Sequence, residues 1–262
     1  MLGVASINPL YTLSGFAVGM LVGVTGVGGG SLMTPLLVLL FGIHPATAVG
    51  TDLLYAAVTK SVGTAMHGFN RTVDWVVVRR LAAGSAPATV ATIFVLYLVG
   101  NTGGGSSKLI SSVLGVAVLI TAVLLLSRNW LLARLAPHMG TDGPRHAKAL
   151  TVVAGIVLGV LVSLSSVGAG ALGVTALILL YPTMPTTRIV GSDIAHAVPL
   201  TLLAGLGHWW LGSIDWHLLL SLLTGSIPGI IVGSLIAVRV PDRVVRPALA
   251  CVLVLVGGRL VL

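Results

Sequence analysis

The chain has 262 residues, of which 56% are hydrophobic and 8% are charged, and its formal net charge is +8. Soluble domains have about 25% charged residues, so this composition excludes a soluble globular domain and indicates an integral membrane protein. The cations stand mainly in the joints between apolar segments, where they set orientation in the membrane, and we expect no nucleic-acid partner.

Apolar segments of up to about 20 residues recur along the chain, long enough to cross a hydrocarbon core as helices. A β-barrel would need short alternating strands, which the sequence does not show. The N-terminal stretch MLGVASINPL has no Lys or Arg, and we expect it to be part of the mature chain. The single cysteine, Cys251, excludes an intramolecular disulfide and a cysteine-built metal site.

Glycines break the first apolar stretch. The sequence VTGVGGGSLMTP, from Val24 to Pro35, separates apolar limbs at 10–24 and 31–43. Limbs of about 15 residues are about 22 Å long as helices, which is short of a full crossing. We expect a re-entrant hairpin whose tip ends inside the protein, and the alternative is a pair of bent crossings.

Three longer apolar segments follow, and the whole pattern then repeats after a shift of 140 or 141 residues. The sequence GVGGGSL (26–32) corresponds to SVGAGAL (166–172), and GTD (50–52) corresponds to GSD (191–193). VDW and GSAP in the first half correspond in the same order to IDW and GSIP in the second. Such ordered matches indicate an internal duplication. The second broken stretch is 150–165 and 171–181, and the longer segments are 47–67, 76–99 and 108–127 in one half and 187–211, 217–238 and 244–262 in the other.

The sequence therefore predicts two transmembrane units, 1–127 and 149–262, joined by a polar linker at 128–148. Arginines flank the connection before 76–99 in the first unit, whereas the equivalent connection of the second unit has none. At the next connection the excess of basic residues is in the second unit instead. This reversal favours an inverted-topology repeat. We expect an all-α, polytopic bundle, each unit having a glycine-broken helix pair and three long helices. It would lie in the cell (inner) membrane, with a cytoplasmic linker and both termini outside.

The glycine breaks are candidate anion sites. A helix that begins near the break presents free N–H groups and the positive end of its dipole, and two such ends facing each other near the midplane would suit a small anion. The alternative is close helix packing through small residues. The candidate substrate-binding residues are Gly28, Gly29, Gly30, Ser31, Thr51, Lys60, Ser166, Gly168, Gly170 and Ser192.

Several ionisable residues lie within the apolar segments, where they are costly and tend to mark transport pathways. Asp52 and Asp193 match in the two units, and each has two interpretations: a helix cap or a proton-coupling carboxylate. Lys60 could attract the anion, form an internal ion pair or extend to the membrane surface. Histidines can carry protons near neutral pH. The proton-coupling candidates are Asp52, Asp193, His67, His196 and His208.

The glycine cluster from Gly26 to Gly30, followed by Pro35 and by Ala48, Gly50 and Thr51 at the start of the next helix, resembles the sulfite exporter TauE/SafE family. The resemblance covers nearly the full length, including the duplicated layout and the polar linker. It implies a polytopic transporter that exports sulfite or a small organosulfonate such as sulfoacetate.

We therefore expect a secondary transporter that exports a small sulfur oxyanion by alternating access at a midplane site. The alternatives are an anion channel, a membrane-embedded enzyme and a scaffold subunit. An enzyme is disfavoured because the sequence shows no matched nucleophile and base, metal motif or cofactor fingerprint. We expect no metal and no cofactor. The expected partners are the anion and the lipid bilayer, and a homodimer is left open.

Overall fold

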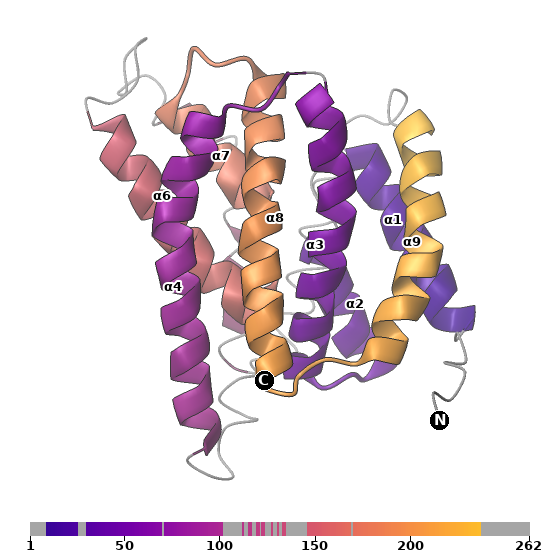
Figure 1. Cartoon of the computed structure of the whole chain (residues 1–262). Coiled ribbons are helices and arrows are strands. Elements are labelled where there is room, and N and C mark those ends of the chain that lie inside the picture. Colours follow the sequence, from indigo (N-terminus) through magenta and orange to yellow (C-terminus); the bar gives the residue numbers. More distant parts are fainter. Residues whose placement is uncertain are drawn as a thin grey trace.

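The computed structural model describes residues 9–25, 30–69, 71–101, 146–168 and 170–236, with separate positions between 112 and 134. These residues form eight helices and no strand, which confirms the all-α prediction over the described part (Figure 1). The helices are α1 (Pro9–Thr25), α2 (Gly30–Phe41), α3 (Pro45–Phe69), α4 (Trp75–Asn101), α6 (Ala147–Ser165), α7 (Ala171–Leu180), α8 (Thr186–Trp210) and α9 (Trp216–Ile236).

Both predicted breaks and four of the six predicted long segments coincide with these helices to within a few residues. The third long segment of each unit, at 108–127 and 244–262, and most of the linker at 128–148 lie outside the continuously described ranges. The boundaries of the two units therefore stay a prediction.

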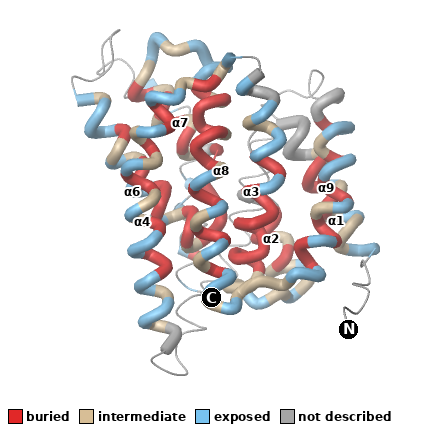
Figure 2. The backbone as a smooth tube through the Cα atoms, in the orientation of Figure 1, coloured by how far each residue is buried: buried red, intermediate tan, exposed pale blue. Residues whose placement is uncertain are grey.

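Among the described helices, four are long and apolar enough to cross a membrane: α4, α6, α8 and α9. Helix α3 is as long as α8, with 25 residues, but it is too polar to be among these four. Its polar residues, including Asp52 and Lys60, are buried inside the bundle, and their low hydropathy is therefore no sign of exposure to water. Figure 2 shows the buried sides of α3 and α8 in the centre of the molecule. The chain is a polytopic helical membrane protein.

The central helices α3 and α8 correspond to each other by the sequence shift and run antiparallel (Figure 1). Gly50, near the start of α3, packs against Ser213, just after α8. Gly191, near the start of α8, packs against Thr72, just after α3. These two contacts join equivalent positions, because Gly50 corresponds to Gly191 and Thr72 to Ser213.

The outer helices also pack across the predicted units, with α1 against α9 and α6 against α4. A Cβ atom on Gly15 of α1 would overlap the carbonyl oxygen of Leu222, and one on the equivalent Gly155 of α6 would overlap that of the equivalent Leu81. The same holds for several further glycine contacts in these two interfaces. Small residues let helices approach closely in a membrane. The two interfaces are equivalent under the sequence shift, and the inversion of the two units stays a prediction.

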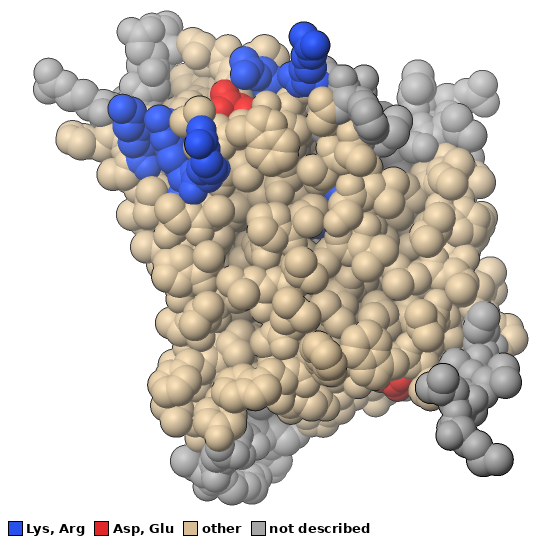
Figure 3. Space-filling model, in the orientation of Figure 1, with Lys and Arg blue, Asp and Glu red and all other residues tan. Residues whose placement is uncertain are grey.

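Basic side chains gather at one end of the molecule, where α3 ends and α4, α6 and α8 begin (Figure 3). We call this the basic end, and it carries Arg71, Arg79, Arg80, Lys148 and Arg188. The opposite end includes the starts of α1, α3 and α9 and the end of α8.

Two aspartates, Asp74 and Asp215, cap the helices α4 and α9. Asp74 Oδ1 accepts hydrogen bonds from the backbone N–H groups of Val76 and Val77, at 3.0 and 3.3 Å. Asp215 Oδ1 accepts one from Leu218 N at 3.0 Å. These bonds satisfy N–H groups of the first helical turn that have no partner within the helix.

Candidate functional site

Each glycine-broken stretch forms one long limb and one short limb, as the predicted ranges indicated for the second stretch, whereas in the first we expected two limbs of about 15 residues. The long limbs α1 and α6 have 17 and 19 residues, and the short limbs α2 and α7 have 12 and 10. At about 1.5 Å per residue, the short limbs are about 18 and 15 Å long, roughly half of the hydrocarbon core. The limbs are unequal because a tight turn and a proline, Pro45 or Pro185, soon follow the short one and start the next helix.

The break between α6 and α7 is built from residues in left-handed backbone conformations. Ser166 ends α6 with φ 56°, and Gly168 and Gly170 have φ 112° and 127°. L-residues with a side chain rarely adopt the last two values, so the glycines allow the turn. The chain reverses there, and α7 begins inside the protein.

Asp52 caps a helix other than its own. It is the eighth residue of α3, and its Oδ2 accepts hydrogen bonds from Thr34 N and Thr34 Oγ1 at 3.2 and 2.6 Å. Thr34 lies near the start of α2, so the carboxylate occupies the positive end of that helix dipole. Neither interpretation of Asp52 included a contact with α2, the helix that precedes α3.

Asp193, the equivalent residue of α8, lies against the start of α7 in the same way. A Cβ atom on Gly173 would overlap Asp193 Oδ1, so the carboxylate fills the space that glycine leaves in the first turn of α7. Asp193 is 1% exposed, which places it fully inside the protein. Both short limbs therefore begin against an aspartate of the following long helix.

Lys60 of α3 lies in the interior between these two carboxylates. It is buried, and its ammonium interacts electrostatically with Asp193 and, less strongly, with Asp52. Burial excludes an extended conformation that reaches the membrane surface. The side chain of Ser166 approaches Asp52 from the second break. We call Asp52, Lys60, Ser166 and Asp193 the central polar site.

Three buried oxygen atoms of the central polar site have no hydrogen-bond partner among the described residues: Asp52 Oδ1, Asp193 Oδ2 and Ser166 Oγ. Buried polar groups are nearly always paired, and several orphans in one place indicate a missing ligand, water or proton. The site therefore has both the charge and the unused bonding capacity that ligand binding requires.

Two residues predicted to bind substrate, Thr51 and Ser192, instead make equivalent bonds across the units. Thr51 Oγ1 accepts a hydrogen bond from Asp215 N at 3.1 Å, and Ser192 Oγ accepts one from Asp74 N at 2.8 Å. Each bond ties the start of α9 or α4 to a central helix. Each side chain thus has a structural partner, and its role in substrate binding stays a prediction.

We expect Thr51→Val and Ser192→Ala to lower the free energy of unfolding by about 1 kcal/mol each, because each removes one hydrogen bond. The affinity for a bound anion should stay at the wild-type value. Thermal unfolding in detergent, with and without ligand, measures both quantities. A loss of affinity at unchanged stability would return these residues to the binding site.

Two of the candidate histidines, His196 and His208, are buried, and His208 lies in the last turn of α8. His196 Nε2 lies 2.9 Å from Ser85 Oγ, and its ring interacts electrostatically with Lys60. His208 Nε2 lies 2.9 Å from the carbonyl oxygen of Ser163. His196 therefore adjoins the central polar site. His208 lies against α6 at Ser163, which is three residues before Ser166 at the second break.

Part of the predicted site cannot be placed. Gly28 and Gly29 lie outside the described residues, and so do the side chains of Ser31 and His67. Gly30 is the first residue of α2. The structure thus brings together the second break and the ionisable residues, while the first break is described only from Gly30 onward.

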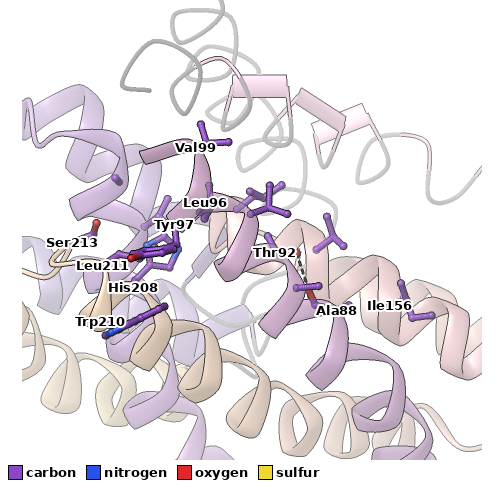
Figure 4. A pocket seen from close by; sticks show the side chains of 16 residues that line it. Ala88, Thr92, Leu96, Tyr97, Val99, Ile156, His208, Trp210, Leu211 and Ser213 are labelled. Carbon is purple, nitrogen blue, oxygen red and sulfur yellow. Dashed lines mark hydrogen bonds between the residues drawn. The ribbon is translucent and has the colours of Figure 1, made fainter. Parts of the chain in front are cut away.

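A cavity of about 780 Å³ lies between α4, α6 and the end of α8 (Figure 4). Its walls are mostly apolar and include Val95, Leu96 and Ile156, and Thr92 bonds its own helix through the Ala88 carbonyl at 2.8 Å. His208 and Leu164 also line it. The cavity therefore extends from the end opposite the basic end to Leu164, which is two residues before Ser166 in the sequence.

Sequence reasoning missed Thr34, Gly173 and Ser85. Glycine in a helix costs about 1 kcal/mol relative to alanine, so Gly173 in the first turn of an otherwise aliphatic α7 was a signal of close approach. Thr34 and Ser85 gave no such signal, because both are common residues in membrane helices.

Comparison with known proteins agrees with this architecture. Residues 11–260 match the model of the family described as sulfite exporter TauE/SafE. The chain is 39% identical to the probable membrane transporter protein YjnA of Bacillus subtilis over 250 residues, covering 95% of this chain and 98% of that protein. It is 26% identical to the probable membrane transporter protein YdhB of the same organism, covering 92% and 94%.

A more distant relative is the probable membrane transporter protein MJ0441 of Methanocaldococcus jannaschii, with 25% identity over 76% of this chain and 70% of that protein. No solved structure matches the chain. The family match covers nearly all of the described helices and the segments between them. The chain is a membrane transporter protein, and it belongs to the sulfite exporter TauE/SafE family.

Proposed function

We propose that the protein is a secondary transporter that exports a small sulfur oxyanion, such as sulfite or an organosulfonate such as sulfoacetate, by alternating access at the central polar site. The observation that carries this proposal is Lys60, a buried lysine that interacts electrostatically with both aspartates that lie against the half-length helices. The family description supports the sulfur oxyanion as the class of substrate.

The chemistry of the site suits an anion whose charge is balanced. Lys60 supplies a full positive charge, and the helix starts near Gly30 and Gly170 supply N–H groups and partial positive charge. Ser166 supplies a hydroxyl with no partner in the described residues. Two carboxylates would repel an anion if both stayed ionised, so Asp52, Asp193 or the adjacent His196 would take up a proton as it binds.

Access from one side at a time is a property of inverted-repeat transporters, in which equivalent elements exchange conformations. The antiparallel central helices and the matched glycine contacts support such a repeat here. The cavity beside His208 offers a path from the end opposite the basic end.

The basic end would face the cytoplasm, because short cytoplasmic joints carry an excess of Lys and Arg. The start of α1 would then lie outside the cell membrane. Export of one negative charge from a negative interior is favourable by about 2.3 kcal/mol per 100 mV. The cavity would therefore be the exit path for the anion.

A thermal-shift screen of the purified protein tests the proposal. The panel is sulfite, sulfate, thiosulfate, sulfoacetate and taurine, with acetate and succinate as carboxylate controls. We expect sulfite or sulfoacetate to raise the unfolding temperature in a concentration-dependent way, because a ligand that binds only the folded state stabilises it. Stabilisation by the carboxylates alone would contradict the sulfur oxyanion as substrate.

Proteoliposomes separate a transporter from an anion channel with the same fold. A transporter shows saturable counterflow, in which unlabelled anion on one side drives uptake of labelled anion from the other. A channel instead gives currents in planar bilayers at rates far above about 10³ ions per second, the upper part of the usual range for enzyme turnover. Such currents without counterflow would overturn alternating access.

A further inference from the structure

The two equivalent aspartates have different partners. Asp52 is held by two hydrogen bonds from Thr34, and the residue equivalent to Thr34 in the second unit is Val174, whose side chain cannot donate. The bonds fix one oxygen of Asp52 against α2. Asp52 thus works as a fixed cap of the short limb.

The position of α7 that is equivalent to Thr34 offers Asp193 no hydroxyl, because it is Val174. The Asp193 carboxylate rests against Gly173, and its Oδ2 is buried without a hydrogen-bond partner in the described part of the chain. The nearby cation is Lys60, and the residue equivalent to Lys60 in the second unit is Thr201. The symmetry of the two units is therefore broken twice, and both differences concern the partners of the aspartates.

We infer that Asp193 alone is the coupling carboxylate: it gives up its interaction with Lys60 and takes a proton when Lys60 binds the anion, while Asp52 stays a structural cap. This inference rests on the proposed function and assigns its coupling step. For a singly charged anion such as hydrogensulfite the exchange is balanced, because one negative charge joins Lys60 as one proton neutralises Asp193. No other charge in the site has to change.

The surroundings of Asp193 favour this exchange. The charged group that interacts with Asp193 is Lys60 on α3, and Lys60 in turn interacts with Asp52 on its own helix and with His196 on α8. The first turn of α7 presents Gly173, and α4 reaches His196 through Ser85. An unpaired charge in a protein interior is costly, so once an anion holds Lys60, a proton is the least costly partner for Asp193.

Matched variants at the equivalent positions test the inference. Asp193→Asn and Asp52→Asn are reconstituted in liposomes that hold a pH-sensitive dye, and labelled sulfoacetate uptake and proton movement are measured together. We expect Asp193→Asn to lose at least about 90% of the proton movement per anion carried, whatever its rate of transport, and this tenfold change is large against ordinary variation. Asp52→Asn should keep the wild-type ratio, because the asparagine oxygen still accepts the bonds from Thr34.

Infrared difference spectra at one neutral pH, with and without sulfite, test the protonation without any transport. The band of a protonated carboxylic acid should appear on addition of sulfite in the wild type and in Asp52→Asn but not in Asp193→Asn. Proton movement or the acid band persisting in Asp193→Asn, or disappearing only in Asp52→Asn, would overturn the inference. Wild-type protein that shows the Asp193 band but no counterflow would instead contradict the proposed function.

Discussion

Replacing Gly173 by alanine should abolish anion transport while the protein still assembles in the membrane. The added Cβ would overlap Asp193 Oδ1 and force the carboxylate away from the first turn of α7. Alanine stabilises a helix relative to glycine by about 1 kcal/mol, so α7 itself is not weakened. Counterflow in proteoliposomes should fall by at least about tenfold, equal to 1.4 kcal/mol of transition-state free energy.

The matched control is Gly63→Ala on α3. A Cβ atom there would lie 3.5 Å from Ile194 Cγ2, an ordinary contact. This variant should transport at the wild-type rate. Normal transport by Gly173→Ala would show that the position of Asp193 against α7 has no part in the cycle.

Replacing Lys60 by glutamine should lower both stability and anion affinity. The change leaves two buried carboxylates without the cation that faces them, and breaking a buried ion pair by removing one partner typically costs about 3–5 kcal/mol. Protonation of a carboxylate would recover part of this loss. Thermal unfolding in detergent and ligand-induced shifts with sulfoacetate measure the two effects.

The double variant Lys60→Gln with Asp193→Asn separates the loss of stability that comes from an unbalanced buried charge from the loss of anion binding. It should recover most of the lost stability, because the pair becomes neutral, but it should not recover anion binding. Arg79→Gln at the exposed basic end is the control, and its effect on stability should stay below about 1 kcal/mol. If the single Lys60 variant binds the anion as tightly as wild type, Lys60 does not contact the substrate.

Periodicity and repeated motifs were enough to predict the eight described helices, because apolar runs bounded by glycine and proline leave few alternatives in a membrane. The shift of 140 or 141 residues also placed Asp52 and Asp193 at equivalent positions. The capping roles of Asp74 and Asp215 followed from local sequence alone, since a cap depends on residues two or three positions away.

Contacts between helices could not be predicted in this way. Nothing in the sequence places Thr34 against Asp52, or Gly173 against Asp193, because these contacts depend on how the short limbs fold back onto the long helices. The roles of Thr51 and Ser192 were missed for the same reason. From the sequence alone, a hydroxyl near a glycine break looks like a ligand-binding group, because its hydrogen-bond partner in the other unit is visible only in the structure.

The packing of α1 on α9 has a consequence for synthesis in the membrane. Helix α1 is the first described helix to leave the ribosome, and its partner α9 is the last. The small residues of α1, including Gly15 and Gly19, therefore have no contact with Leu222 and Ser226 of α9 until the intervening helices have been inserted. Neither half of the chain could complete its own interfaces. Two half-length chains expressed separately would have to insert with opposite orientations and meet in the same bilayer before either became a stable fold.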